Sequence, residues 1–159
     1  MRPRLAVLGL VVPLLAIAMG GAAHADATTT SFTATITVVQ TGAPQRQWVD
    51  DGILHVRHQR FSDDVSGDLS GTQVSIGSID LNLATGEGTG RARLELATDR
   101  GSWSGHLSGQ IQNFAFSGHL EGEGTGDSKG TRIQGVFWQT GNNPETFIVK
   151  GRILDTGDD

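Results

Sequence analysis

The sequence contains no cysteine, and the part that follows residue 25 has only two prolines, Pro44 and Pro144. Without cysteine there is no disulfide bond, so a packed core or a closed sheet must supply the stability. Positive charge is also scarce, because after residue 25 there are 10 Lys and Arg against 17 Asp and Glu, a net charge of −7. An acidic domain repels phosphate groups and anionic lipid, which argues against nucleic acid and membrane surfaces as partners.

The N-terminus has the three parts of a secretory signal peptide. They are the basic residues Arg2 and Arg4, the apolar run over residues 5–19, and the small-residue cleavage site Ala23-His24-Ala25. A membrane anchor is the alternative, but the run contains Pro13 and its roughly 15 residues fall short of the ~20 that span a bilayer. We therefore expect cleavage after Ala25, a secreted protein without stable membrane insertion, and a single domain over residues 26–159.

That domain is rich in glycine and reads as antiparallel β-structure throughout. Hydrophobic residues alternate with polar ones at a period of two, as in Ile79, Leu81 and Leu83, and no segment shows helical periodicity. Many glycines alternate with Leu, Ile, Trp and Phe, which is typical of strands whose backbones approach closely rather than of a disordered linker. Turn signals at residues 50–52, 62–64, 85–86, 98–101, 126–130 and 141–144 divide the domain into eight or nine strands.

Three consecutive hairpins can be placed in register by requiring large side chains to face small ones. The loops used are Thr85-Gly86, Thr98–Gly101 and Gln112-Asn113. Leu81 then faces Gly90, Leu94 faces Gly105, and Gly105 in turn faces Leu120. Because each hairpin has one apolar and one polar face, the sheet must cover its apolar face. With no helix available, the interpretation we favour is an all-β fold, a single antiparallel up-and-down barrel of about eight strands.

The tryptophans and a phenylalanine are the candidate ligand contacts. An eight-stranded barrel is filled by side chains or holds one small ligand, and the sequence leaves that choice open. Trp103, Phe116 and Trp138 are the candidate residues for an apolar ligand. In the register above Trp103 faces Gly122 and Leu96, which favours a core position for that residue.

A row of polar residues is the other candidate site. The predicted register places Arg93, His106 and His119 side by side on three strands, with Glu121 in the adjoining row. Two facing histidines could bind a metal ion. A flat polar face nevertheless lacks the pocket and the oxyanion donors that acyl transfer needs, so a solvent-exposed face is the preferred interpretation. His55-Val56-Arg57-His58 is interpreted as a solvated basic strand, since residues three apart point to opposite faces. The sequence predicts no metal site, no cofactor and no catalytic residue.

Gly122 to Phe137, GEGTGDSKGTRIQGVF, resembles the glycine-spaced strand–turn–strand pattern of allene oxide cyclase-like barrels, which are similar in shape to dirigent proteins. Trp103-Ser104-Gly105 has a looser likeness to avidin-type barrels. The first resemblance implies an eight-stranded barrel with an apolar lumen that steers a reactive substrate without a cofactor. Two functions therefore stay open. The first is non-enzymatic binding of a small apolar ligand or a protein partner. The alternative is a cofactor-free cyclase, isomerase or coupling-guidance protein. The sequence does not predict the oligomeric state.

Overall fold

The computed structural model describes residues 28–156, which form nine β-strands and one short 3-10 turn. The strands are β1 (Thr28–Thr41), β2 (Arg46–Asp50), β3 (Ile53–Gly67), β4 (Gly71–Asn82), β5 (Gly88–Thr98), β6 (Gly101–Gln112), β7 (Ala115–Thr125), β8 (Thr131–Asn142) and β9 (Glu145–Asp155), with the 3-10 turn η1 (Gly126–Ser128) between β7 and β8. The predicted signal peptide lies outside the described residues. Across residues 28–156, no helix has the length and apolarity to cross a bilayer.

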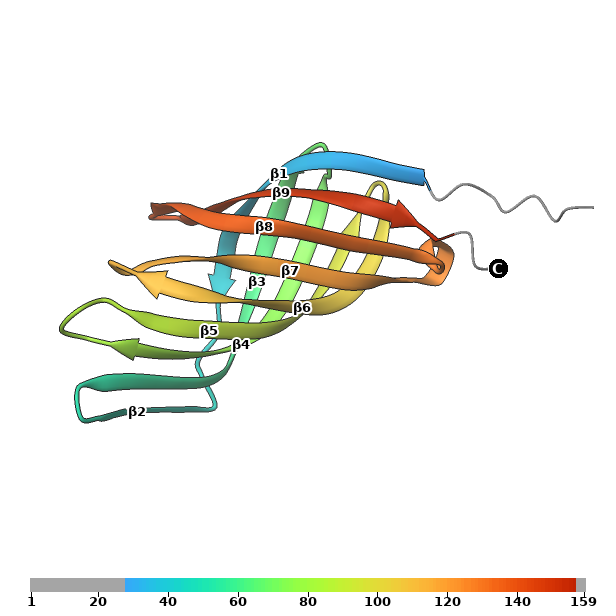
Figure 1. Ribbon diagram of the computed structural model, residues 1–159. Helices are drawn as coiled ribbons and strands as arrows, with labels where there is room; N and C mark the ends of the chain where they lie inside the picture. The colour runs from blue at the N-terminus through green and yellow to red at the C-terminus, as the bar shows by residue number, and fades with distance from the viewer. Residues whose placement is uncertain (1–27, 157–159) are drawn as a thin grey trace, which may run out of the picture.

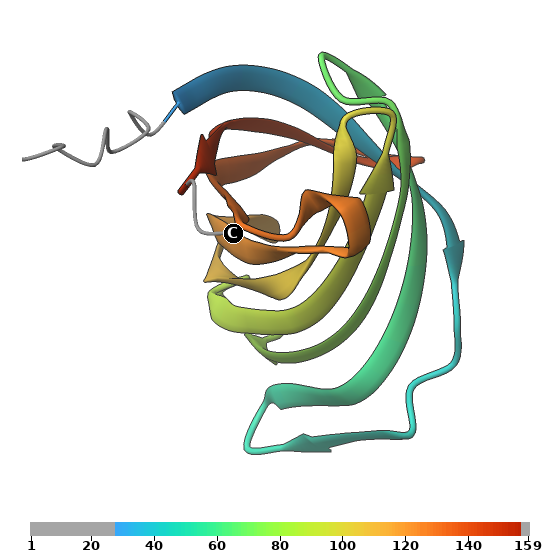
Figure 2. The same ribbon diagram turned by 90° about the vertical axis from the view of Figure 1, so that its right-hand side faces the viewer.

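The strands close into an antiparallel barrel, as the sequence predicted. Strands β3 to β9 pair with their neighbours in chain order, and β1 pairs with β9. The second half of β1 also pairs with β3, which closes eight strands into a ring. β2 pairs with the first part of β3 and continues the sheet outside that ring. Figures 1 and 2 show the strands wrapped around one interior, with β2 at the outer edge.

The two ends of the barrel differ in their connections. The hairpin turns β2–β3, β4–β5, β6–β7 and β8–β9 gather at one end, on the left of Figure 1, and we call this the open end. The β3–β4 and β5–β6 turns and η1 lie at the other, which we call the closed end. Backbone hydrogen bonds join three open-end turns, from Leu83 N–H to the Gly52 carbonyl and from Phe114 N–H to the Gly86 carbonyl. These hydrogen bonds therefore hold the three turns next to one another at the open end.

The closed end holds the hydrophobic core. Trp103, Leu69, Leu94, Ile133 and Val149 are its largest fully buried side chains. Trp103, Leu94 and Ile133 alternate with polar neighbours along their strands, so these strands present their apolar faces to the interior. Leu69 lies in the turn between β3 and β4. The Trp103 indole N–H donates to Thr131 Oγ1 at 3.0 Å, and this hydroxyl donates to the Ser128 carbonyl at 2.7 Å. These bonds fasten η1 over the core.

Two of the three predicted registers are wrong by two residues, although the predicted faces within the strands are right. Leu83, which the alternation placed beside Ile79 and Leu81, lies in the β4–β5 loop and is exposed. The β5–β6 register is confirmed, with Leu94 opposite Gly105. On β4 and β5, however, it is Ile79 that faces Gly90, because the loop spans five residues rather than two. On β6 and β7, Gly105 faces Gly122, because the turn falls at Asn113-Phe114. A slip of two residues preserves the side-chain alternation, whereas a slip of one would reverse it.

Residues 62–64 form no turn, contrary to the sequence prediction. They lie within β3, where Asp63 is paired with Val38 of β1 and Gln73 of β4. The sequence left open which face of residues 132–140 points inward. The structure shows that Ile133 and Phe137 do.

Candidate ligand-binding site

A cavity of about 100 Å³ lies inside the barrel between the closed-end core and the open end. Its lining comes from eight strands and is mostly apolar. The lining residues are Ile36, Val38, Phe61, Asp63, Gln73, Ser75, Gly77, Ile79, Arg91, Ala92, Leu107, Phe116, Leu120, Phe137, Glu145, Phe147 and Val149. The barrel is thus filled at one end and hollow toward the other.

Aromatic rings form one wall of the cavity. Phe116, Phe137 and Phe147 make three edge-to-face pairs, with ring centroids 5.0, 6.5 and 6.0 Å apart. Phe116 also covers Gly90, where an added Cβ would meet the ring. Edge-to-face packing fixes the rings against one another, so this wall is a preformed apolar surface.

The opposite wall carries a buried carboxyl group. Asp63 is only 4% exposed, and its Oδ2 accepts a hydrogen bond of 2.9 Å from Gln73 Nε2, directly across the β3–β4 pair. Its other oxygen, Oδ1, is buried and has no hydrogen-bond partner. The pKa of Asp63 is raised to about 6, chiefly by burial. The nearby Glu145 and Asp64 carboxylates contribute to this rise, and the Gln73 hydrogen bond opposes it.

The charged groups around the cavity are unbalanced. Glu145 on β9 also borders it, and burial raises the pKa of this carboxyl. Arg91 borders it from β5 but is exposed. Gly90 and Ala92, its neighbours in the strand, face the interior, so the alternation of β5 directs the Arg91 side chain outward. The two carboxyl groups therefore have no cation facing them inside the cavity among the residues that line it.

The three aromatic residues predicted to bind a ligand occupy three different environments. Phe116 lines the cavity. Trp103 is 2% exposed within the closed-end core and does not border the cavity. Trp138 follows the inward-facing Phe137, and the Lys150 ammonium lies 5.8 Å from the centre of its ring. The Trp138 ring is therefore half-buried on the outer face of the barrel.

The predicted polar row also lies on the outer face and is assembled differently. Arg93 does face His106, but His106 faces Glu121, because the β6–β7 register is shifted by two residues. His119 faces Ser108 instead. All four of Arg93, His106, His119 and Glu121 are exposed. Within the described residues no group of three or more His, Asp or Glu side chains is arranged to hold a metal ion.

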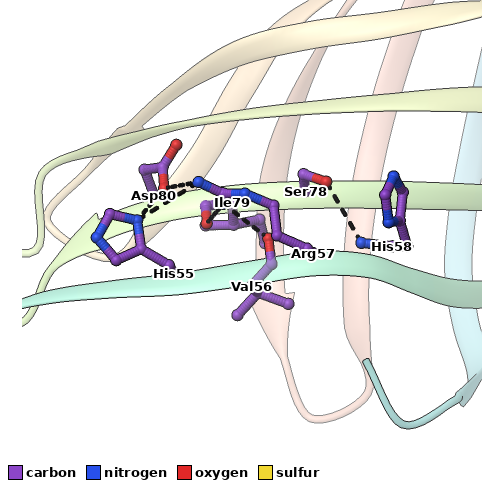
Figure 3. A network of polar contacts seen from close by, with 7 residues as sticks. All are labelled: His55, Val56, Arg57, His58, Ser78, Ile79 and Asp80. Atoms are coloured by element: carbon purple, nitrogen blue, oxygen red, sulfur yellow. Dashed lines mark hydrogen bonds and ion pairs between the residues drawn. The ribbon is translucent and has the colours of Figure 1, made fainter. Parts of the chain in front are cut away.

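The basic segment on β3 is not a freely solvated strand, and this interpretation was wrong. His55 Nδ1 and Arg57 Nη2 both contact Asp80 Oδ1, at 2.5 and 2.6 Å, and both side chains are half-buried (Figure 3). Burial alone would raise the pKa of Asp80, but hydrogen bonds from Arg57 and His55 outweigh it and lower this pKa. The His55 ring also stacks on Trp48 of β2 with centroids 4.7 Å apart. This network attaches β2 to the barrel.

His58 takes no part in that network. A bulge between Val56 and Gln59 interrupts the β3–β4 register, and His58 has a φ of 53°. Its backbone N–H donates to Ser78 Oγ at 3.3 Å, while its ring points away from His55 (Figure 3). The two histidine rings therefore do not lie together.

The sequence analysis missed the polar residues inside the cavity, although part of the signal was present. Alternate residues of a strand lie on the same face. On β4, the residues that share the inward face of Ile79 are therefore Gly77, Ser75 and Gln73. Asp63 was not identified as an interior residue, because the acidic residues at 63 and 64 were interpreted as part of a turn. No sequence signal for Glu145 was available, because its role depends on the closure of β9 against β1.

Few known proteins are similar to this chain. No family model and no curated protein matches it. Its fold is similar to the crystal structure of a protein of unknown function from the DUF3224 family of Shewanella oneidensis MR-1, with a TM-score of 0.55 and 15% sequence identity. The match covers 80% of this chain and 97% of that one. At this identity the likeness shows a shared fold, that of a closed β-barrel of unknown function.

Proposed function

We propose that this protein is a secreted barrel that binds one small, largely apolar molecule in the cavity toward its open end. The observation that carries the proposal is the cavity itself, about 100 Å³ in volume and walled by Phe116, Phe137 and Phe147. Pockets for small molecules are typically concave and mostly apolar, with a few polar groups that orient the ligand. Gln73 and Asp63 are such groups here.

The size of the cavity restricts the ligand. An enclosed apolar cavity of about 150 Å³ holds a benzene molecule in another protein. The present cavity is smaller, but it reaches the open end of the barrel. The part of the ligand inside the cavity is therefore no larger than a ring or branched chain of about six carbon atoms, and any larger part would extend through the open end.

The test is a titration of the protein with cyclohexanol, in which binding is detected by changes in the amide chemical shifts of NMR spectra. We expect saturable shifts at residues of the cavity, and weakening of the affinity by about tenfold or more in Ala92→Leu, because three added carbon atoms occupy the space. Ala97→Leu makes the same change at an exposed position of β5 and is the matched control. Absence of saturable shifts, or equal affinity in Ala92→Leu, would contradict the proposal.

A second candidate function is cofactor-free acid–base catalysis of an isomerisation or cyclisation. It is favoured by Asp63, whose pKa of about 6 is near the value at which a general base works best at neutral pH. The resemblance of Gly122–Phe137 to allene oxide cyclase-like barrels is consistent with it. Mass spectrometry separates the two functions. It first identifies the small molecule that co-purifies with the protein from its own culture medium, and then shows whether that molecule changes in mass or structure when it is incubated with the protein. A binder leaves the molecule unchanged, whereas an enzyme converts it and Asp63→Asn stops the conversion.

A further inference from the structure

Asp63 borders the cavity and carries a buried carboxylate oxygen that has no hydrogen-bond partner. A buried polar atom without a partner costs free energy, so such atoms are rare and call for an explanation. Oδ2 is held by Gln73, which fixes the orientation of the carboxyl group. Oδ1 is buried and lacks a partner. The side chain is 4% exposed and borders the cavity, so a group placed in the cavity lies beside this carboxyl group.

From this arrangement we propose that the ligand carries a protonated amine, which donates a hydrogen bond to Asp63 Oδ1 while its apolar body lies against the phenylalanine wall. The inference rests on the proposed binding function and names the chemical class of its ligand.

The charge of the cavity favours an amine over a neutral or acidic ligand. Asp63 and Glu145 are the two ionisable groups that face the cavity, both carboxyls, while Arg91 is directed outward by the alternation of β5. With a pKa of about 6, Asp63 is mostly ionised at neutral pH. An ammonium group neutralises a charge that the protein leaves unpaired, whereas a carboxylate ligand would add a third negative charge in an apolar environment.

The opposite wall is also suited to a cation. The faces of aromatic rings attract ammonium groups, and the attraction increases as the ion loses its water. Phe61, on the same strand as Asp63, and the phenylalanine wall supply such rings around the cavity. The rings therefore pack against the apolar body of the ligand and also favour its positive charge, while the amine contacts Asp63.

The experiment compares three probes that share one ring: cyclohexylamine, cyclohexanol and cyclohexanecarboxylate. Their affinities for the purified protein are measured at about pH 7.5 by NMR titration. We expect cyclohexylamine to bind about tenfold more tightly than cyclohexanol, as a charge-assisted hydrogen bond does relative to a neutral one. The carboxylate should bind most weakly.

Asp63→Asn is the decisive variant, with Asp64→Asn as the matched control at the exposed neighbour. The first should remove the preference for the amine while cyclohexanol binding persists, and the second should leave the preference intact. Glu145→Gln gives a second measurement, and should weaken amine binding by a smaller factor. If cyclohexanol binds as tightly as cyclohexylamine, or if Asp63→Asn keeps the preference, the amine inference is wrong and the binding function stands. If none of the three probes binds, both are wrong.

Discussion

The buried carboxyl of Asp63 predicts an unusual dependence of stability on pH. Its pKa is raised from 3.8 to about 6, chiefly by burial. Below pH 3.8 the group is protonated in the folded and in the unfolded chain. As the pH rises toward 6, the unfolded chain releases its proton while the folded chain keeps it, so the free energy of unfolding falls. Above pH 6 both states are ionised and the full loss remains.

The magnitude follows from the difference between the two pKa values. At 1.36 kcal/mol for each pH unit, the change from 3.8 to about 6 corresponds to about 3 kcal/mol. The raised pKa of Glu145 acts in the same direction. Asp80 acts in the opposite direction, because its lowered pKa contributes stability that is lost as the pH falls through it. The pH curve of the unmodified protein therefore mixes several groups.

The difference between the protein and its Asp63→Asn variant isolates the one carboxyl. Urea unfolding followed by tryptophan fluorescence, at intervals from about pH 4 to about pH 7.5, gives the free energy of unfolding of both. Relative to the unmodified protein, the variant should gain about 2.5 kcal/mol between these limits, because about 0.5 kcal/mol of the loss has already occurred at pH 4. Asp64→Asn, at an exposed residue, should show only a small part of this gain, because the Asp64 carboxylate is the smallest of the causes that raise the pKa of Asp63. A difference between the protein and Asp63→Asn that stays constant with pH would refute the reasoning.

Two further predictions concern the packing of the barrel. An added Cβ at Gly105 would overlap the backbone carbonyl of Glu121 on the facing strand, so Gly105→Ala should lower the free energy of unfolding by about 3 kcal/mol. At Gly77 the atom nearest to an added Cβ would lie 3.4 Å away, so Gly77→Ala is the control and should change the free energy of unfolding little. Equal losses of this free energy in the two variants would contradict the prediction. Trp103→Phe removes the hydrogen bond to Thr131 and should cost about 2 kcal/mol in the same assay. A loss below about 0.5 kcal/mol would mean that this bond contributes nothing.

The sequence predicted the class of fold and the faces of the strands because both depend on local alternation. A side chain's face follows from its position parity along a strand, and parity survives a register slip of two residues. For this reason Leu94, Trp103 and Leu120 were assigned correctly to the interior, although the partner of Leu120 was not.

Registers depend on turn geometry, which the sequence signals less clearly. The β6–β7 turn has positive φ at both Asn113 and Phe114, 51° and 64°, as a type I′ turn requires. Asparagine suits the first position, but the second favours glycine, so a phenylalanine there conceals the turn. In the β4–β5 loop, Asn82 Oδ1 instead accepts hydrogen bonds from the backbone N–H groups of Ala84 and Thr85, which stabilises a longer connection.

The cavity could not be predicted because it depends on contacts between distant strands. The pKa of Asp63 reflects apolar neighbours from β1, β7 and β9 that come together only when the barrel closes. A sequence window around Asp63 shows a second acid, Asp64, and suggests a solvated turn. The candidate residues were accordingly sought among the aromatic and the outer polar side chains, and of these candidates only Phe116 lines the cavity.

The pattern of β4 argues that the cavity is more than a packing defect. In its first half the polar Gln73 and Ser75 are buried, at 5% each, while Ile76 on the outer face is 45% exposed. This reverses the arrangement that maximises apolar burial. The closed end has the usual arrangement, with the apolar side chains of Leu94 and Trp103 inside the barrel. A barrel whose sequence served stability alone would place an aliphatic side chain at position 75 and fill the space, since each buried methylene contributes about 0.8 kcal/mol. Among the described residues, the buried polar and charged side chains are Asp63, Gln73 and Ser75, which lie on the adjacent strands β3 and β4. Sites that depart from the stabilising pattern are where function is expected, and here the departure surrounds one unpartnered carboxylate oxygen.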